Sequence, residues 1–146
     1  MDYQNFKDVD AIHQLKARYL RGGDTKNWDL WADTLTEDFV GTFDGMPRPS
    51  PDMPTTATFA GRGNMKKLMS VFMADIVSAH QVILPEINIT SETTATGIWA
   101  LMDYIRMPTC IFRGWGHYHE NYVKQAGVWR IKNLRVTRLI VEETWI

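Results

Sequence analysis

Residues 93–107, TTATGIWALMDYIRM, decide the fold class of this chain. Apolar and polar side chains alternate along much of this stretch with a period of two, which is typical of a β-strand that buries one face. Three further segments, rich in valine, isoleucine, threonine and aromatic residues, predict strands at 80–89, 110–124 and 128–142, with a turn at 125–127. The second half of the chain is therefore predicted to be a sheet of long antiparallel strands.

The first half predicts helices instead. Apolar residues recur at helical spacing over 8–21, where Asp8 is a candidate N-cap and Gly22-Gly23 is expected to end the helix. Shorter helices are predicted over 27–35 and 64–74, and a short strand over 40–43. Helices followed by long antiparallel strands predict an α+β fold, a cone-shaped curved sheet with the N-terminal helices packed on its concave face and a cavity at its open end.

Residues 44–56 form a proline-rich segment between the two halves. Prolines at 47, 49, 51 and 54 exclude regular structure there. Loops longer than about 12 residues are often lids or binding loops. We therefore expect this loop to gate the cavity, with hydrogen exchange that slows when a ligand binds.

Length and composition narrow the kinds of protein that this chain can be. A chain of 146 residues suits one domain, 1–146. The net charge of −1, with scattered basic residues, argues against a nucleic-acid partner, and no run approaches the about 20 apolar residues of a membrane span. The N-terminus is polar and the single cysteine, Cys110, has no disulfide partner within the chain, so a cytoplasmic protein is expected. Six Trp, six Phe and five Tyr would suit a large core or a pocket for a flat apolar ligand.

Strand and helix periodicity turn four polar side chains toward the interior, namely Tyr19, His80, Asp103 and Arg138. The apolar residues expected to share their faces are Trp99, Leu101 and Ile105 for Asp103, Leu134, Val136 and Ile140 for Arg138, and Val82 and Leu84 for His80. Because buried charge is costly unless it is paired, one shared polar site explains these positions together.

In this interpretation Asp103 hydrogen-bonds one nitrogen of His80, and His80 acts as a general base. Arg138 balances the carboxylate charge or polarises a substrate oxygen, and Tyr19 donates a hydrogen bond to such an oxygen. Each residue also has a purely structural interpretation: a satisfied core histidine, a structural Asp–Arg ion pair and a core tyrosine.

Other candidates are weaker. Asp24 could simply cap the second helix. His117 and His119 share a strand face, a spacing that can bind a metal, but no third ligand is recognisable and we predict no metal site. The sequence contains no P-loop, no GxSxG and no HExxH.

Several segments together resemble SnoaL-like members of the NTF2-like superfamily. Those that resemble the family's opening are IHQLKARY at 12–19, Asp24, WDLW at 28–31 and LTEDF at 35–39. Those similar to its closing hairpin are GHYHENY at 116–122 and GVWRI at 127–131. The resemblance covers nearly the whole chain. It is more specific for the fold than for the reaction, because this cup hosts dehydratases, isomerases, cyclases, hydrolases and non-enzymes.

The closest pattern is that of the bile-acid dehydratases and, more loosely, of scytalone dehydratase. The resemblance implies the catalytic set Tyr19, Asp24, His80, Asp103 and Arg138. Scytalone dehydratase has a second active-site histidine, for which His117 is the candidate here. The proline-rich segment departs from the pattern, so a different substrate is expected even if the chemistry is shared.

The implied reaction is cofactor-independent proton abstraction next to a carbonyl, by a dehydratase (lyase) or an isomerase. The implied substrate is a small apolar polycyclic or aromatic molecule, steroid- or polyketide-like. Residues expected to bind it are Trp28, Phe43, Trp99, Trp115 and His117. Two alternatives stay open, a non-catalytic small-molecule-binding module and a small subunit of a ring-hydroxylating oxygenase. A homo-oligomer, dimer or trimer, is expected because one sheet face is left uncovered.

Overall fold

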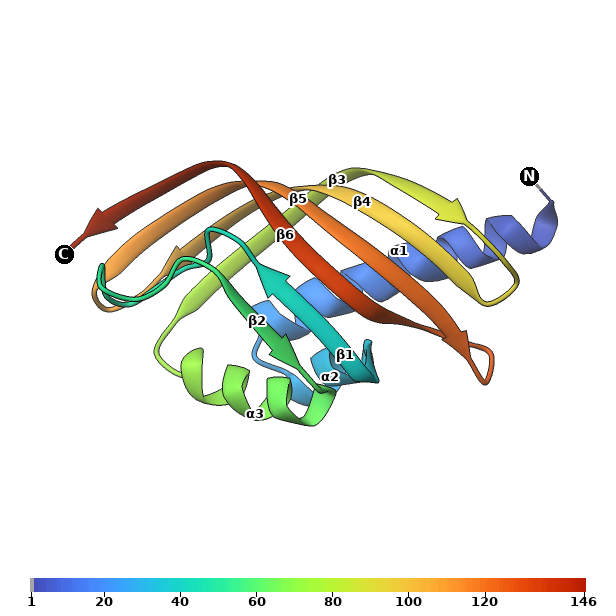
Figure 1. The fold of residues 1–146 in the computed structure, drawn as a ribbon, viewed down its shortest axis with the longest axis horizontal. Helices are drawn as coiled ribbons and strands as arrows, with labels where there is room; N and C mark the ends of the chain where they lie inside the picture. The colour runs from blue at the N-terminus through green and yellow to red at the C-terminus, as the bar shows by residue number, and fades with distance from the viewer. Residues whose placement is uncertain (1) are drawn as a thin grey trace.

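Six strands form one curved open sheet in the computed structural model, which describes residues 2–146 (Figure 1). The strands are β1 (Leu35–Phe43), β2 (Ala57–Ala60), β3 (Val77–Ile89), β4 (Thr94–Arg106), β5 (Cys110–Gln125) and β6 (Val128–Trp145). Their order is β2-β1-β6-β5-β4-β3, with β1 and β6 parallel and the other described neighbours antiparallel. The long strands of the second half are confirmed, whereas β2 was not predicted.

Three helices, α1 (Tyr3–Asp24), α2 (Trp28–Asp33) and α3 (Arg62–Phe72), cover the concave face (Figure 1). The long α1 crosses under the strands, and α2 and α3 lie below β1 and β2. Ile12 and Leu15 of α1 are fully buried against sheet residues such as Phe39 and Ile131. The predicted α+β architecture is therefore confirmed.

Helix α1 is longer at both ends than its periodicity predicted. Asp2, not Asp8, is the N-cap and accepts a hydrogen bond from the Asn5 amide at 2.8 Å. Asp8 is instead buried and accepts from the Trp129 indole at 2.9 Å.

The helix also runs through Gly22-Gly23 rather than ending there. A Cβ on Gly22 would lie 2.9 Å from the Trp31 backbone nitrogen, so this glycine allows α1 to approach α2 closely. Asn27 caps α2 by accepting from the Leu30 amide. Asp24, carried at the end of α1, is thus left free for another role.

Two bulges reverse the predicted alternation locally. In β6 the register shifts where Arg138 and Ile140 pair with Gly116 and Trp115, and in β3 it shifts between Ile83 and Glu86. Leu84 is 87% exposed and Ile140 is 52% exposed. The prediction that these two residues share the inward faces of His80 and Arg138 is therefore wrong, because each bulge inserts an extra residue into the period.

The proline-rich segment 44–56 is a loop, as predicted, and it is tied to the strands. Arg48 pairs with Glu143 at 3.0 Å and also donates to the carbonyls of Pro51 and Met53. The Thr109 hydroxyl donates to the Pro49 carbonyl at 2.6 Å. These contacts fix the loop to β6 and to the β4–β5 connection. That the loop gates the pocket stays a prediction.

The convex face of the sheet is the surface through which a homo-oligomer was predicted. It exposes apolar side chains that include Ile98, Met102 and Ile140, and homo-oligomer formation through it stays a prediction. None of the helices in residues 2–146 has the length and apolarity needed to cross a membrane.

Candidate active site

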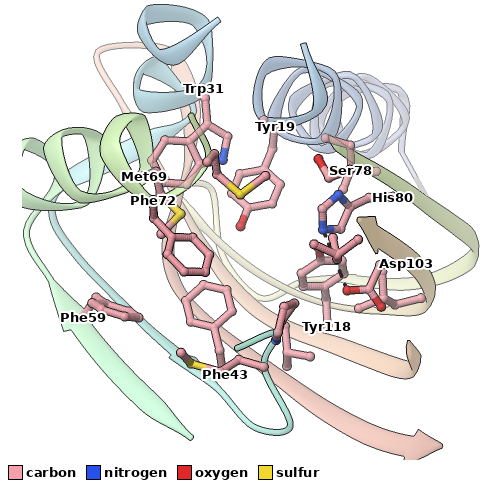
Figure 2. A pocket seen from close by; sticks show the side chains of 18 of the residues that line it. Tyr19, Trp31, Phe43, Phe59, Met69, Phe72, Ser78, His80, Asp103 and Tyr118 are labelled. Atoms are coloured by element: carbon pink, nitrogen blue, oxygen red, sulfur yellow. Dashed lines mark ion pairs between the residues drawn. The ribbon is translucent and has the colours of Figure 1, made fainter. Parts of the chain in front are cut away.

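A pocket of about 300 Å³ opens between the three helices, the loop 44–56 and the concave face of the sheet. Most of its wall is apolar, and the aromatic and sulfur-containing residues include Trp28, Trp31, Phe43, Phe59, Met69 and Phe72. Figure 2 shows Phe43, Phe59, Met69 and Phe72 on one side and Ser78, His80, Asp103 and Tyr118 on the other. The pocket therefore offers one polar end and a large apolar body.

Asp24 and His80 form the tightest polar contact at this end. The Asp24 carboxylate lies 2.6 Å from His80 Nδ1 and accepts from the His80 backbone amide and the Ser78 hydroxyl, both at 2.8 Å. Burial alone would raise the pKa of Asp24, but the hydrogen bonds from His80 and Ser78 outweigh it and hold that pKa below its ordinary value. An ionised carboxylate only accepts. Nδ1 of His80 therefore carries a proton, and Nε2 is the basic nitrogen.

Asp103 lies beside His80 but bonds elsewhere. The two residues are Cα partners on β3 and β4, yet His80 Nε2 and the nearest Asp103 oxygen are 3.9 Å apart, longer than a hydrogen bond. Both Asp103 oxygens accept from the Arg138 guanidinium, at 2.7 and 3.0 Å. The prediction that Asp103 hydrogen-bonds the imidazole is wrong. Arg138 donates to both oxygens of Asp103, and Asp24, at the end of α1, contacts Nδ1 of His80 instead.

Arg138 connects the polar end to the loop. Its Nε donates to the Gly45 carbonyl at 3.2 Å while its two terminal nitrogens hold Asp103. Gly114 lies under this pair, and a Cβ there would collide with Arg138 Nη1 and Asp103 Oδ1. A side chain at position 114 is thus incompatible with the Asp103–Arg138 geometry.

Gly114→Ala is expected to lower the free energy of unfolding by about 1–3 kcal/mol, because overpacking forces the paired groups apart. Urea unfolding measures the change. The matched control is Gly63→Ala in α3, where a Cβ meets nothing within 4 Å and alanine should stabilise by about 0.5–1 kcal/mol. Equal behaviour of the two variants would contradict the packing assigned to Gly114.

Two tyrosines line the pocket. Tyr19 comes from α1 and Tyr118 from β5, with ring centroids 6.2 Å apart, and Figure 2 shows the Tyr19 hydroxyl directed into the pocket. Burial, assisted by nearby negative charge, raises the pKa of both phenols well above their ordinary value. Both hydroxyl groups therefore stay protonated and can donate hydrogen bonds.

The residues predicted to bind substrate divide into two groups. Trp28 and Phe43 line the pocket. Trp99 is buried in the core, where its indole donates to the Tyr122 hydroxyl at 2.8 Å. Trp115 and His117 lie on the outer face of β5, because Gly116 between them and Tyr118 after them are the buried, inward-facing positions. The prediction that Trp99, Trp115 and His117 line the pocket is wrong.

His119 is on the same outer face, where its Nε2 lies 3.0 Å from the Thr137 hydroxyl. Within residues 2–146 no group of three or more potential His, Cys, Asp or Glu ligands could hold a metal ion.

The sequence interpretation missed Tyr118, Ser78 and the part Asp24 plays at His80. Tyr118 and Asp103 could have been placed together by counting parity across the β4–β5 hairpin, where Asp103 pairs with Gly114. Ser78 shares the parity of His80 on β3. The local sequence around Asp24 does not distinguish a residue that caps a helix from one that hydrogen-bonds a histidine.

The lowered pKa of Asp24 predicts an acid-dependent part of stability. A carboxyl whose folded pKa is depressed stabilises the fold above its ordinary pKa of about 3.9, and this contribution is lost as pH falls through the folded value. The stability difference between the wild type and Asp24→Asn should therefore shrink between about pH 5 and pH 2.5, as measured by urea unfolding at stepped pH. A difference that stays constant across this range would contradict an ionised, hydrogen-bonded Asp24.

Comparison with known proteins identifies the family. The model of the SnoaL-like domain matches residues 4–135. The chain belongs to the SnoaL-like domain family. This match covers every residue of the polar end except Arg138, and it agrees with the NTF2-like cup described above.

Solved structures share the fold of this SnoaL-like chain at low identity. A proposed scytalone dehydratase from Novosphingobium aromaticivorans is 19% identical with a TM-score of 0.81, over 100% of this chain and 93% of that one. The hexachlorocyclohexane dehydrochlorinase LinA type 3 from Novosphingobium barchaimii is 17% identical with a TM-score of 0.81, over 99% and 94%. The function-unknown protein Rv3472 from Mycobacterium tuberculosis is 23% identical with a TM-score of 0.74, over 92% and 73%. At these identities the likeness concerns the fold alone.

Proposed function

We propose that this SnoaL-like chain is a cofactor-independent lyase that removes a proton from carbon and eliminates a neighbouring group from an apolar carbonyl compound. The observation that carries this proposal is the Asp24–His80 pair at the polar end of an otherwise apolar pocket. Enzymes named for elimination reactions share the fold, which agrees with this chemistry.

His80 is the base. Asp24 holds the proton on Nδ1 and stabilises the imidazolium that forms, so Nε2 can take a proton from substrate carbon. Asp103 does not compete for Nε2 in the resting state, because Arg138 engages both of its oxygens. Nε2 lies 3.9 Å from the nearest Asp103 carboxylate oxygen.

The electrons of the broken C–H bond move toward the neighbouring carbonyl, and a tyrosine hydroxyl donates to the developing enolate oxygen. Tyr19 and Tyr118 both line the pocket and remain protonated. When the β-carbon carries a hydroxyl, the enolate collapses to a C=C bond and the hydroxyl takes the proton from His80 Nε2 and leaves as water. His80 is then neutral again, so the cycle needs no external acid.

The substrate we propose is uncharged and largely apolar around one carbonyl. Arg138, the guanidinium that reaches this pocket, is already neutralised by Asp103, so it offers little to a free carboxylate or phosphate. Met46, Met53, Met69 and Met73 line the apolar part, and unbranched thioether side chains adapt to differing ring shapes. Steroid- or polyketide-like β-hydroxy ketones fit this description.

Deuterium exchange tests the proposal without knowledge of the natural substrate. Apolar ketones, with and without a β-hydroxyl, are incubated with the protein in D₂O and followed by NMR. We expect enzyme-dependent loss of the α-proton signal, and formation of the enone from β-hydroxy members. Ketones that bind, as shown by a thermal shift, but exchange no proton would overturn the proposal in favour of a binding module.

A further inference from the structure

A buried ion pair lies directly behind the tyrosines of the pocket and has no part in the proton transfer. Lys16 of α1 and Glu120 of β5 are both completely shielded from solvent, with Lys16 Nζ 3.1 Å from Glu120 Oε2. Glu120 Oε1 accepts from the Tyr122 hydroxyl at 2.9 Å, and that hydroxyl accepts from Trp99 Nε1 at 2.8 Å. Both oxygens of the carboxylate are thus held, one by Lys16 and the other by Tyr122.

The ammonium group faces the pocket tyrosines. Lys16 Nζ lies 3.2 Å from the ring centroid of Tyr118 and 4.3 Å from that of Tyr19. Burial lowers the pKa of Lys16 to about 8, against the opposing effect of Glu120, so the group is charged at neutral pH. The pair therefore forms a fixed dipole whose positive end rests on two phenol rings.

Stability alone is a weak reason for such a pair. Removing two charges from water costs several kcal/mol for each ion, and well-packed apolar residues of similar volume often do as well or better. A cation on the face of a phenol ring, by contrast, draws electron density away from the hydroxyl and makes its O–H a stronger donor. Lys16, in contact with the ring faces, thereby acts against the Glu120 carboxylate, which helps to raise the pKa of both phenols. Tyr118, whose ring carries this cation, is one of the residues that line the pocket.

We propose that Lys16, held by Glu120, is a positioning residue that strengthens Tyr118, and to a lesser degree Tyr19, as hydrogen-bond donors to the substrate carbonyl. This inference rests on the proposed function, since it requires that the two tyrosines act on a substrate oxygen. It adds a charged support that touches neither the substrate nor His80.

The test uses the double variant Lys16→Met/Glu120→Gln. Changing both residues avoids leaving one buried charge alone, and the glutamine oxygen can still accept from Tyr122. The probe is 2-acetonaphthone, with a ¹³C-labelled carbonyl for infrared difference spectra. The matched apolar probe is 2-isopropylnaphthalene, which has a similar shape and no oxygen. Circular dichroism and thermal unfolding establish that each variant is folded.

We expect the carbonyl stretch of the probe to lie at lower wavenumber in the wild type than in an apolar solvent, and to move back toward the solvent value in the double variant. Affinity for 2-acetonaphthone should fall about tenfold in the double variant, whereas affinity for 2-isopropylnaphthalene should not change. Tyr118→Phe should produce the same spectral change with Lys16 and Glu120 still in place.

Two results would overturn the inference in distinguishable ways. If Tyr118→Phe loses the carbonyl shift while the double variant keeps the wild-type shift and affinity, the ion pair is only a structural clamp and the proposed function stands. If the wild-type protein fails to bind the ketone, or binds it with an unshifted carbonyl, the tyrosines are not donors and both proposals fail.

Discussion

His80→Gln is expected to slow α-proton exchange of a bound ketone by about 10²–10⁴-fold, because the variant has no basic nitrogen at the position of Nε2. The glutamine side chain is polar and of similar size, so the half-buried position should remain compatible with the fold. NMR exchange rates in D₂O at saturating ketone measure the loss. Thermal unfolding of the same preparation shows that the protein is intact.

The chain offers a matched control for this experiment in His117. It lies on the outer face of β5, across the sheet from the pocket, so His117→Gln should exchange at the wild-type rate. Slowing of similar size in both variants, or full exchange by His80→Gln, would place the base elsewhere.

Asp24→Asn should lower the exchange rate by roughly 10³–10⁴-fold, as expected when a histidine base is held in the wrong tautomer. An asparagine amide can donate to Nδ1, and the imidazole proton then sits on Nε2, where a base is required. Affinity for the ketone should change little, because Asp24 bonds His80 and Ser78 rather than lining the pocket. The expected signature is therefore a loss of rate without a loss of binding.

The variant Asp103→Asn distinguishes the role of Asp103 from that of Asp24. This variant keeps the Asp24–His80 contact but leaves the Arg138 charge with a neutral partner, so its main loss should be in stability, about 3–5 kcal/mol for a broken buried pair. Its exchange rate should fall less than that of Asp24→Asn. An Asp103→Asn protein with wild-type stability and the larger loss of rate would identify Asp103 as the residue that orients the base.

Many of the inward-facing residues of the long strands could be predicted, because side chains alternate between the two faces of a strand with a fixed period of two. It placed His80 and Asp103 side by side on neighbouring strands, as the register of β3 and β4 has them. The same argument failed at Ile140 and Leu84, because each lies at a register shift that inserts an extra residue and leaves no mark in the local pattern. His117 was expected in the pocket from the family resemblance, and alternation was not applied to β5, where it places both Trp115 and His117 on the outer face.

The partner of His80 could not be deduced from local sequence. Two consecutive glycines favour a helix end, yet the close approach of α1 to Trp31 at Gly22 outweighs that preference. Only because the helix continues does Asp24 reach the imidazole. The ion pair of Lys16 and Glu120 was equally hidden, since its members are 104 residues apart along the chain.

The unbroken course of α1 also bears on how this protein can evolve. One rigid helix carries Lys16, Tyr19 and Asp24, and a single inserted or deleted residue between them would turn one against another by about 100° and shift it by about 1.5 Å. This interval is therefore closed to changes in length. The loop 44–56 contributes Met46, Pro47 and Met53 to the pocket without carrying any of the proton chemistry. New substrate preferences within this lineage should accordingly arise by insertion, deletion and substitution in that loop, while the spacing from Lys16 to Asp24 is inherited unchanged.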